Sequence, residues 1–328
     1  MWDFSISDAM GLMKKTFPFV LFRMVVYFVI AAAYVIATGT GAGIGWGVGA
    51  MGDDDFRASA IFWGGSIGFA ATAGVILFLR QYILYIVKAG HIAVMVEAME
   101  GRDLPAGRAQ IDHARKVVTD RFATANVLFG VDALIKGVLA AITGLVQGLA
   151  NLLPIPAVDQ MMGVVRAFLR LSVGLIDEVI LAYLIRKDSD NPWKDAQSAL
   201  VLYGQNHKPM LKNAFWLMLI VYGVSAVVFL IMLAPAAAVV YMIPGAWSAG
   251  GFVFAILFAW AFKAALIEPF AIACMLQVYF AKIEGQTPDP EWEAKLSGMS
   301  NKFKELGEKA AGWATGKGKP APETATEA

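Results

Sequence analysis

The sequence predicts an all-α polytopic membrane protein with six transmembrane helices in three hairpins, joined by cytoplasmic amphipathic helices. Two observations predict this class. Of the 328 residues, 58% are hydrophobic and 16% are charged, whereas soluble domains are about 45–50% apolar and about 25% charged. Several apolar stretches also reach the roughly 20 residues that a helix needs to cross a hydrocarbon core.

The six expected spans cover residues 17–38, 58–79, 123–150, 160–185, 213–243 and 250–280. The second is expected to continue as a helix to residue 99. Together they define a six-span transmembrane domain over residues 17–285. The N-terminal stretch before them opens with polar and acidic residues, unlike a signal peptide, so we expect the first span to remain in the mature protein.

Loop charges predict the orientation. The segments 100–122 and 186–212 each hold five Lys or Arg residues, whereas 151–159 and 244–249 hold none, and 39–57 holds three Asp against one Arg. Lys and Arg accumulate on the cytoplasmic side of membrane proteins. We therefore expect both termini in the cytoplasm, and the Ala, Gly and Val content of the spans suits a bacterial inner membrane.

Amphipathic segments accompany the spans. Residues 1–16 form one, and each of three cytoplasmic segments combines a Pro-containing turn with a mixed-charge helix, which suggests a threefold repeat. Polar turns are needed by any hairpin protein, so the pattern alone does not establish the repeat. We expect residues 315–328 to be disordered because they are small and polar.

The last amphipathic helix is expected over residues 286–314, with an apolar stripe that includes Trp292, Phe303 and Trp313. Aromatic residues on one face and lysines elsewhere are typical of helices that lie in the headgroup plane, so these three residues are candidates for lipid binding. The same stripe fits docking onto the other cytoplasmic helices or onto a partner.

The alternating glycines of residues 39–52 do not match a nucleotide-binding loop, because neither the spacing nor a preceding strand is present. We expect a loosely packed helix end or a flexible external loop there.

Charged side chains inside the expected spans are the candidate site. A charge near the bilayer centre costs about 2.5–3.5 kcal/mol on insertion scales, so such residues are rare and often functional. Asp132 and Lys136 lie four apart, on one helical face, whereas Lys263 and Glu268 are about 140° apart on an ideal helix and cannot face one partner. The candidate substrate-binding residues are Asp132, Lys136, Arg170, Asp177, Glu178, Lys263 and Glu268.

Two interpretations of these charges remain open. They form structural ion pairs, or they line a hydrated cavity that receives a cation or proton. Pro269 follows Glu268 and is expected to free a backbone carbonyl near Ala265. Arg23 lies near a span end, where a long side chain can extend to the interface without a function.

The sequence contains little that indicates soluble-type chemistry. The three histidines lack metal-ligand spacing, the only cysteine is Cys274, and no nucleophile motif occurs. We expect no enzymatic activity, no cofactor, no metal and no nucleic-acid partner.

One stretch resembles a known family. In "YGQNHKPMLKNAFWLM", residues 203–218, the positions Tyr203, Gly204, Asn206 and 212–215 match a segment of choline transporter-like proteins that leads into a late transmembrane helix. The similarity covers about the last 130 residues at most, and the family's cysteine-containing extracellular domain is missing. The resemblance implies a transporter fold and function but assigns no substrate-binding residue.

The sequence therefore predicts a transporter-like membrane protein for a small organic cation or other polar solute. The alternative is a non-transporting scaffold or assembly factor whose amphipathic helices bind lipid or a protein partner. The bilayer is the expected partner in both cases, and a homo-oligomer is compatible with either.

Overall fold

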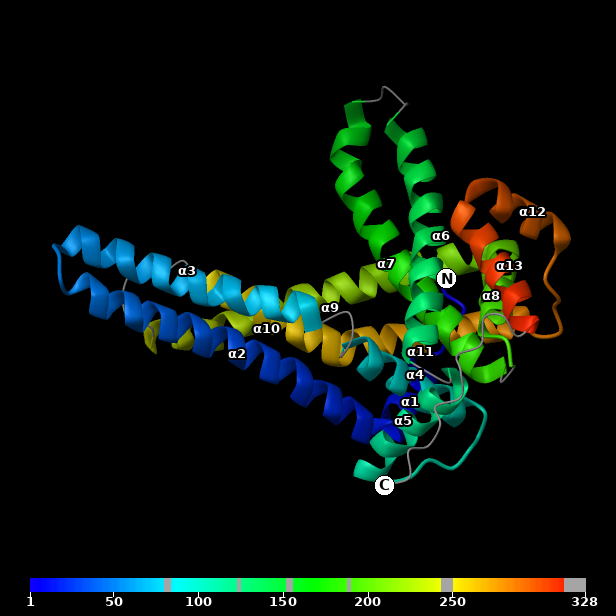
Figure 1. The fold of residues 1–328 in the computed structure, drawn as a ribbon, viewed down its shortest axis with the longest axis horizontal. Coiled ribbons are helices and arrows are strands. Elements are labelled where there is room, and N and C mark those ends of the chain that lie inside the picture. Colours follow the sequence, from blue (N-terminus) through cyan, green and yellow to red (C-terminus); the bar gives the residue numbers. More distant parts are fainter. Residues whose placement is uncertain (80–83, 123–124, 152–155, 188–189, 243–249, 316–328) are drawn as a thin grey trace. The chain divides into compact units, whose positions relative to one another are not determined.

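The computed structural model describes residues 1–79, 84–122, 125–151, 156–187, 190–242 and 250–315. Within these ranges the chain is almost entirely helical and forms no strand (Figure 1). The all-α prediction is confirmed. The chain divides into two compact units: unit 1 combines 1–15, 92–218 and 271–328, and unit 2 combines 16–91 and 219–270.

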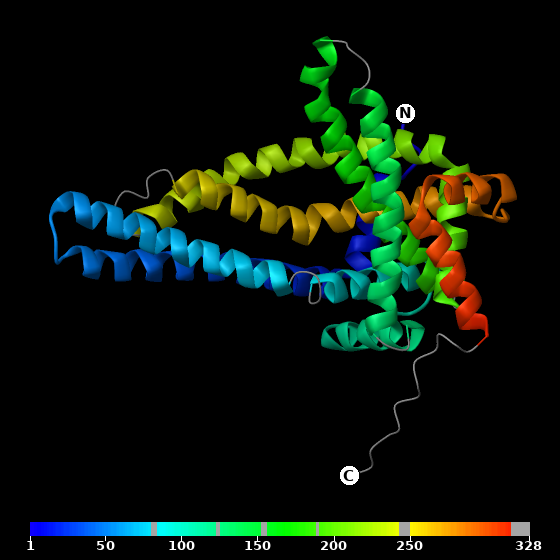
Figure 2. The same ribbon diagram turned by 45° about the horizontal axis from the view of Figure 1, so that its top comes forward.

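Unit 2 is a bundle of helices. Its long helices are α2 (Phe17–Gly49), α3 (Asp54–Leu79), α9 (His207–Met242), from Leu219 on, and α10 (Gly250–Phe262). The four helices run side by side in Figures 1 and 2. Ala42 and Phe254 belong to one of its apolar core clusters, and Tyr27 and Ala264 belong to another.

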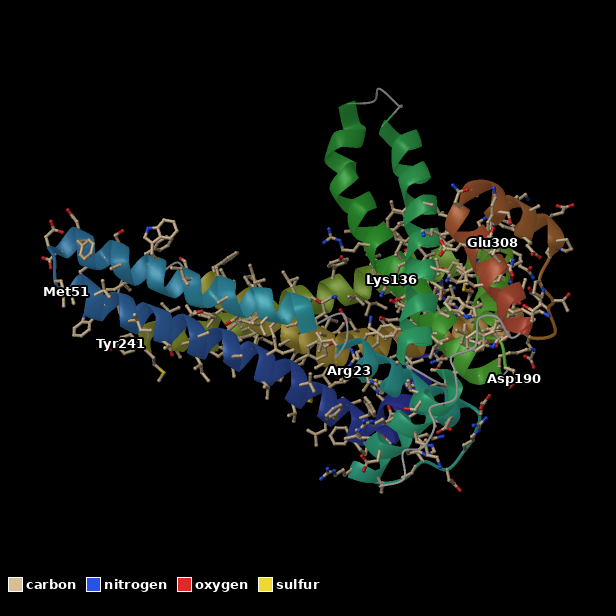
Figure 3. All side chains as sticks on the ribbon, in the orientation of Figure 1. Arg23, Met51, Lys136, Asp190, Tyr241 and Glu308 are labelled. Carbon is tan, nitrogen blue, oxygen red and sulfur yellow. The ribbon has the colours of Figure 1, made fainter. Side chains whose placement is uncertain are left out.

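Among the residues that the structure describes, four helices are long and apolar enough to cross a membrane: α2, α3, α9 and the continuous helix Gly250–Ile283. Most of their surface is not covered by protein, and large apolar side chains such as Ile36 and Tyr241 are exposed; Tyr241 is labelled in Figure 3. These features support a multi-pass membrane protein. The remaining two expected spans correspond to the helices α6 (Ala125–Asn151) and α7 (Pro156–Lys187), which are not among these four.

The glycine stretch is helical and tightly packed, which corrects the expected loose end or loop. It extends α2 to Gly49, and its backbone lies directly against α3. A Cβ atom added to Gly41 would lie only 2.1 Å from the Gly64 carbonyl oxygen, and one on Gly45 would lie 2.1 Å from that of Ala60. Only glycine permits this approach of two backbones.

Parts of three helices build the core of unit 1. They are the last residues of α4 (Tyr85–Met99), the second half of α7, and most of α11 (Glu268–Ile283), all almost completely buried. Around them lie α1 (Ile6–Lys15), α5 (Arg108–Phe122) and α8 (Pro192–Gln205). The expected amphipathic helices after Pro-containing turns are therefore present. Helices that are apolar on every side need such complete burial.

The C-terminal segment forms two helices, α12 (Pro290–Met299) and α13 (Asn301–Ala314), where one was expected. Ser300 has an extended backbone, with φ −145° and ψ 120°, and interrupts the helix. The apolar stripe is docked within unit 1: Phe303 is fully buried, and Trp313 donates from Nε1 to the Asp190 carbonyl oxygen at 2.5 Å.

This arrangement favours docking over lipid binding for the stripe. Phe303 and Trp313 are buried by protein, and α13 packs on α8 and α6. Trp292 lies against Gly204, and its ring centroid is 5.1 Å from that of His207. The expected disordered tail beyond Thr315 lies outside the described residues.

Candidate functional site

The charged residues expected in the spans form two separate groups, one in each unit. In unit 1, Lys136 donates from Nζ to Asp132 Oδ2 at 2.5 Å and lies 3.8 Å from Asp177 Oδ2. Both carboxylates are buried, whereas the Lys136 side chain is half-exposed (Figure 3). Asp132 and Lys136 thus share one face of α6, as their spacing predicts, and α7 supplies the second acid.

Glu178 and Arg170 differ in exposure. Glu178 is buried beside Asp177 on α7, whereas Arg170 is exposed. Of the seven candidates, Lys263 and Glu268 belong to unit 2 and the other five to unit 1.

In unit 2, Lys263 and Glu268 face each other. Lys263 Nζ donates to Glu268 Oε1 at 2.8 Å, so the expectation that they point apart is wrong. The reason is the π-helical turn η3 (Lys263–Ile267), in which the Glu268 N–H bonds to the Lys263 carbonyl oxygen. A π turn closes bonds between residues five apart, which brings positions i and i+5 onto one side.

Pro269 and Arg23 account for this turn. Proline has no N–H to donate, and in a π register its missing partner is the carbonyl five residues earlier, that of Ala264. The Arg23 guanidinium of α2 donates from Nη2 to this Ala264 oxygen at 2.5 Å. The freed carbonyl is thus satisfied by another helix, one residue before the expected Ala265.

Arg23 is completely buried, which corrects the expectation that it extends to the interface. Its Nη2 atom lies 3.9 Å from Glu268 Oε2, and its guanidinium carbon lies 5.7 Å from the Tyr27 ring centroid. Its Nε and Nη1 atoms are buried and have no hydrogen-bond partner among the residues that the structure describes. Burial of a guanidinium costs free energy unless a negative charge or hydrogen-bond acceptors compensate its positive charge.

His91 lies in the same unit and is also fully buried. It stacks on Phe19, and its Nε2 lies 3.2 Å from Thr16 Oγ1. Burial and, to a lesser extent, the charge of Arg23 hold the pKa of His91 well below its usual range. The imidazole is therefore neutral at physiological pH and adds no cation to the cluster.

Three cations and one carboxylate interact in the unit 2 cluster. Arg23, Lys88 and Lys263 all act electrostatically on Glu268. In the sequence of 16–91 and 219–270, the only other acidic residues are the three aspartates at 53–55, in the turn between α2 and α3. Neither Arg23 nor Lys88 was a candidate from the sequence, because each lies near the end of an apolar run.

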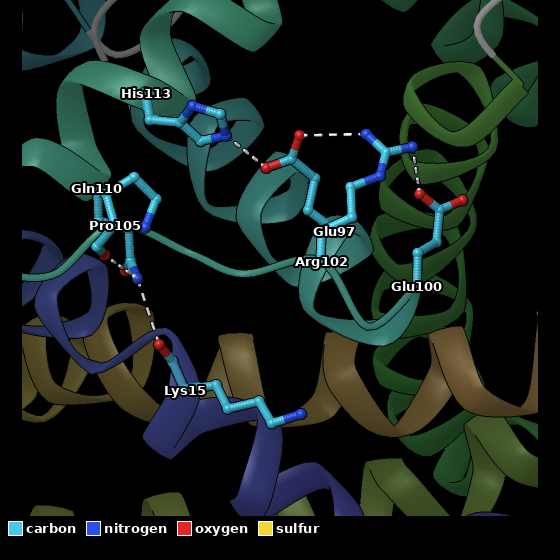
Figure 4. Close-up of polar contacts among 7 residues, drawn as sticks. All are labelled: Lys15, Glu97, Glu100, Arg102, Pro105, Gln110 and His113. Atoms are coloured by element: carbon cyan, nitrogen blue, oxygen red, sulfur yellow. Dashed lines mark hydrogen bonds and ion pairs between the residues drawn. The ribbon is translucent and has the colours of Figure 1, made fainter.

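A polar network in unit 1 was also missed. Glu97 is buried at the end of α4, where His113 Nε2 lies 2.6 Å from its Oε2 and Arg102 Nη1 lies 3.3 Å from its Oε1 (Figure 4). Arg102 also pairs with Glu100 at 2.7 Å. These bonds fasten α5 to α4 across the polar turn, so the network has a structural role. The sequence separation of residues 97 and 113 matches no helical period, so their contact was not predicted from the sequence.

A hollow of about 810 Å³ lies near these helix ends in unit 1. Two ion pairs stand at its lining: Arg186 contacts Glu100 at 3.5 Å, and Asp3 contacts Lys212 at 2.7 Å. The other charged lining residues are Asp8, Lys187 and Glu284.

The residues that carry the family resemblance hold helix ends together. Asn213 is fully buried and exchanges two hydrogen bonds with Asp3, and Asn206 donates to Gln286 at 2.8 Å. No known family model, no curated protein and no solved structure matches this chain. The resemblance to choline transporter-like proteins stays a prediction carried by these residues.

Proposed function

We propose that this chain is a transporter-like membrane protein for a small polar solute, and that the Arg23–Lys263–Glu268 cluster of unit 2 contacts the solute. The observation that carries the proposal is the π turn with a charged pair inside a helix long enough to cross a membrane. Turns of this kind are rare and occur frequently at functional sites.

Energetic cost supports a functional cluster. Ionisable residues at membrane depth are expensive, and evolution retains them mainly along solute, ion or proton pathways. The side chains of Lys263 and Glu268 are 25% and 29% exposed, so a solute can reach this pair, which covers the buried Arg23.

The scaffold alternative has less support. It requires an amphipathic face that is available to lipid or to a partner, but Phe303 and Trp313 are buried within unit 1. The organic-cation variant is also weakened, because Asp132, Asp177 and Glu268 each have a lysine within 4 Å that neutralises them.

The proposal includes a topology with six spans in a bacterial inner membrane. The hairpin of α6 and α7 would form the third pair, with both termini in the cytoplasm, as the loop lysines and arginines indicate. Reporter fusions should place positions 105 and 192 and both termini inside, and 54, 155 and 246 outside. An external C-terminus would exclude an even number of spans.

Transport is tested with the purified full-length chain in liposomes. Capacitively coupled currents are recorded while quaternary amines, amino acids, carboxylates and inorganic phosphate are applied in turn. We expect a current from at least one solute, reduced in Lys263→Gln and retained in Lys282→Gln, a control at an exposed lysine further along the same helix. Folded protein that responds to none of these solutes above protein-free liposomes would refute the proposal.

A further inference from the structure

We infer that Arg23 and Lys263 form a binding site for an oxyanion, a carboxylate or phosphate group, and that Glu268 is the resident anion which the ligand displaces. This inference rests on the proposed function, because it names the chemical class that the same cluster takes. The acidic residues alone suggested a cationic solute, whereas this inference assigns an anionic one.

Arg23 provides the first argument. One of its nitrogens is used by the Ala264 carbonyl, whereas Nε and Nη1 are buried with no hydrogen-bond partner among the described residues. Buried donors without partners are costly. The planar fork of a guanidinium matches the two oxygens of a carboxylate or phosphate, so an oxyanion is the ligand that satisfies Arg23 best.

The position of Glu268 provides the second argument. Its Oε1 accepts from Lys263 at 2.8 Å, but its Oε2 stays 3.9 Å from Arg23 Nη2, which is too long for a hydrogen bond. Glu268 thus lies between two cations and bonds only one of them. A free oxyanion, unconstrained by a side chain, can approach both.

The charge balance provides the third argument. Three cations act on Glu268, and unit 2 has no other acid except the aspartates in the turn between α2 and α3. In a region of low dielectric constant, cations that act on one carboxylate also attract other anions and repel other cations. An anionic group therefore lowers the free energy of this site, and an organic cation raises it.

Binding is tested on the full-length protein in nonionic detergent, by the shift of its thermal unfolding midpoint. The probes are inorganic phosphate and acetate, compared with chloride at constant ionic strength. Stabilisation by a probe reports its affinity. We expect phosphate or acetate to raise the midpoint in a saturable manner.

Three variants and a matched control sharpen the test. Glu268→Gln removes the competing carboxylate and should tighten apparent binding about tenfold or more, whereas Lys263→Gln should weaken it about tenfold, since one charge-assisted bond is gained or lost. Arg23→Lys keeps the charge but loses the fork and should also weaken binding. Lys282→Gln, at an exposed lysine further along the same helix as Glu268, should leave anion binding unchanged.

The Glu268→Gln result decides between a binding role and a structural one. If Glu268 only holds the helices together, its variant destabilises the protein and does not gain affinity. The absence of anion stabilisation in both the wild type and Glu268→Gln, with both folded by circular dichroism, would overturn the inference. This decision does not depend on Arg23→Lys, so the test remains valid if that variant does not fold.

The source of the oxyanion is distinguished by a second arm. Delipidated protein is titrated with short-chain phosphatidic acid and with phosphatidylcholine of the same chain length. Saturable binding of phosphatidic acid that inorganic phosphate cannot displace, and that Lys263→Gln weakens, identifies a lipid headgroup. Displacement by phosphate or acetate identifies a solute.

The two proposals fail in different ways. Anion binding without any solute current would refute transport and leave the oxyanion site standing. A solute current without anion binding, unchanged by Lys263→Gln, would refute the oxyanion site and leave transport standing.

Discussion

Substitution of Gly41 by Ala is expected to disrupt the hairpin of α2 and α3. The Cβ atom that it adds would lie 2.1 Å from the Gly64 carbonyl oxygen, whereas ordinary contacts begin at 3.4 Å. The two helices would have to separate locally by about 1.3 Å, which is the difference between these distances. A gap of this size forfeits a quarter to a half or more of each neighbouring dispersion contact.

Gly43 is the matched control. It lies two residues further along α2, and a Cβ atom added there meets nothing within 4 Å. Both substitutions gain the same helix propensity, about 1 kcal/mol relative to Gly, so this gain cancels in the comparison. The difference in unfolding free energy between the two variants then measures overpacking, which costs about 1–3 kcal/mol.

The assay is reversible unfolding of each variant in mixed micelles of nonionic detergent and dodecyl sulfate, followed by tryptophan fluorescence. Gly41→Ala should unfold at a dodecyl sulfate fraction equal to or below that of the wild type. Gly43→Ala should unfold at a fraction above that of the wild type. Equal stability of the two variants would show that the helices are not packed backbone to backbone, and the reasoning would be refuted.

Two further perturbations probe unit 1. Phe303→Ala should lower the unfolding free energy by about 3–5 kcal/mol and expose α13 to hydrogen exchange. Met299→Ala is the control, because its side chain is 40% exposed, and it should have neither effect. Equal hydrogen exchange of α13 in both variants would contradict its docking. A hydrogen bond from Lys212 holds the pKa of Asp3 below its ordinary value of 3.8. Since the folded-state pKa is depressed, Asp3 stabilises the fold above pH 3.8 and this contribution is lost as the pH falls further. Asp3→Asn should remove this part of the acid dependence, and an unchanged pH profile of thermal unfolding would contradict the assignment.

Patterns confined to one regular helix were predictable from the sequence. Asp132 and Lys136 share a face because a regular α-helix places residues four apart together, and α6 is regular there. The starts of α8 and α12 follow from the same local logic, because Pro192 and Pro290 each stand at the first helical position after a capping side chain. Apolar length likewise predicted the four helices that can cross a membrane.

Features that depend on a second helix were not predictable. The glycine stretch resembles a loose end when α2 is considered alone, and becomes a tight contact only because Gly64 and Gly68 face it from α3. Ser300 interrupts the C-terminal helix although the apolar spacing continues through it. A helical wheel assumes that the helix is continuous, so it cannot detect such a break.

The prediction that Lys263 and Glu268 point apart was wrong for the same reason, because it considered one helix alone. A proline after Glu268 leaves one carbonyl without a donor in any helical register, but it does not determine which one. The guanidinium of Arg23, more than 200 residues away in sequence, bonds the Ala264 carbonyl, which is the one orphaned by a π register. The residue that stabilises the turn is therefore also the residue with two unused donors beside the charged pair. A site built in this way couples ligand binding to helix register, because an oxyanion that pulls on Arg23 acts on the same guanidinium that satisfies the π turn.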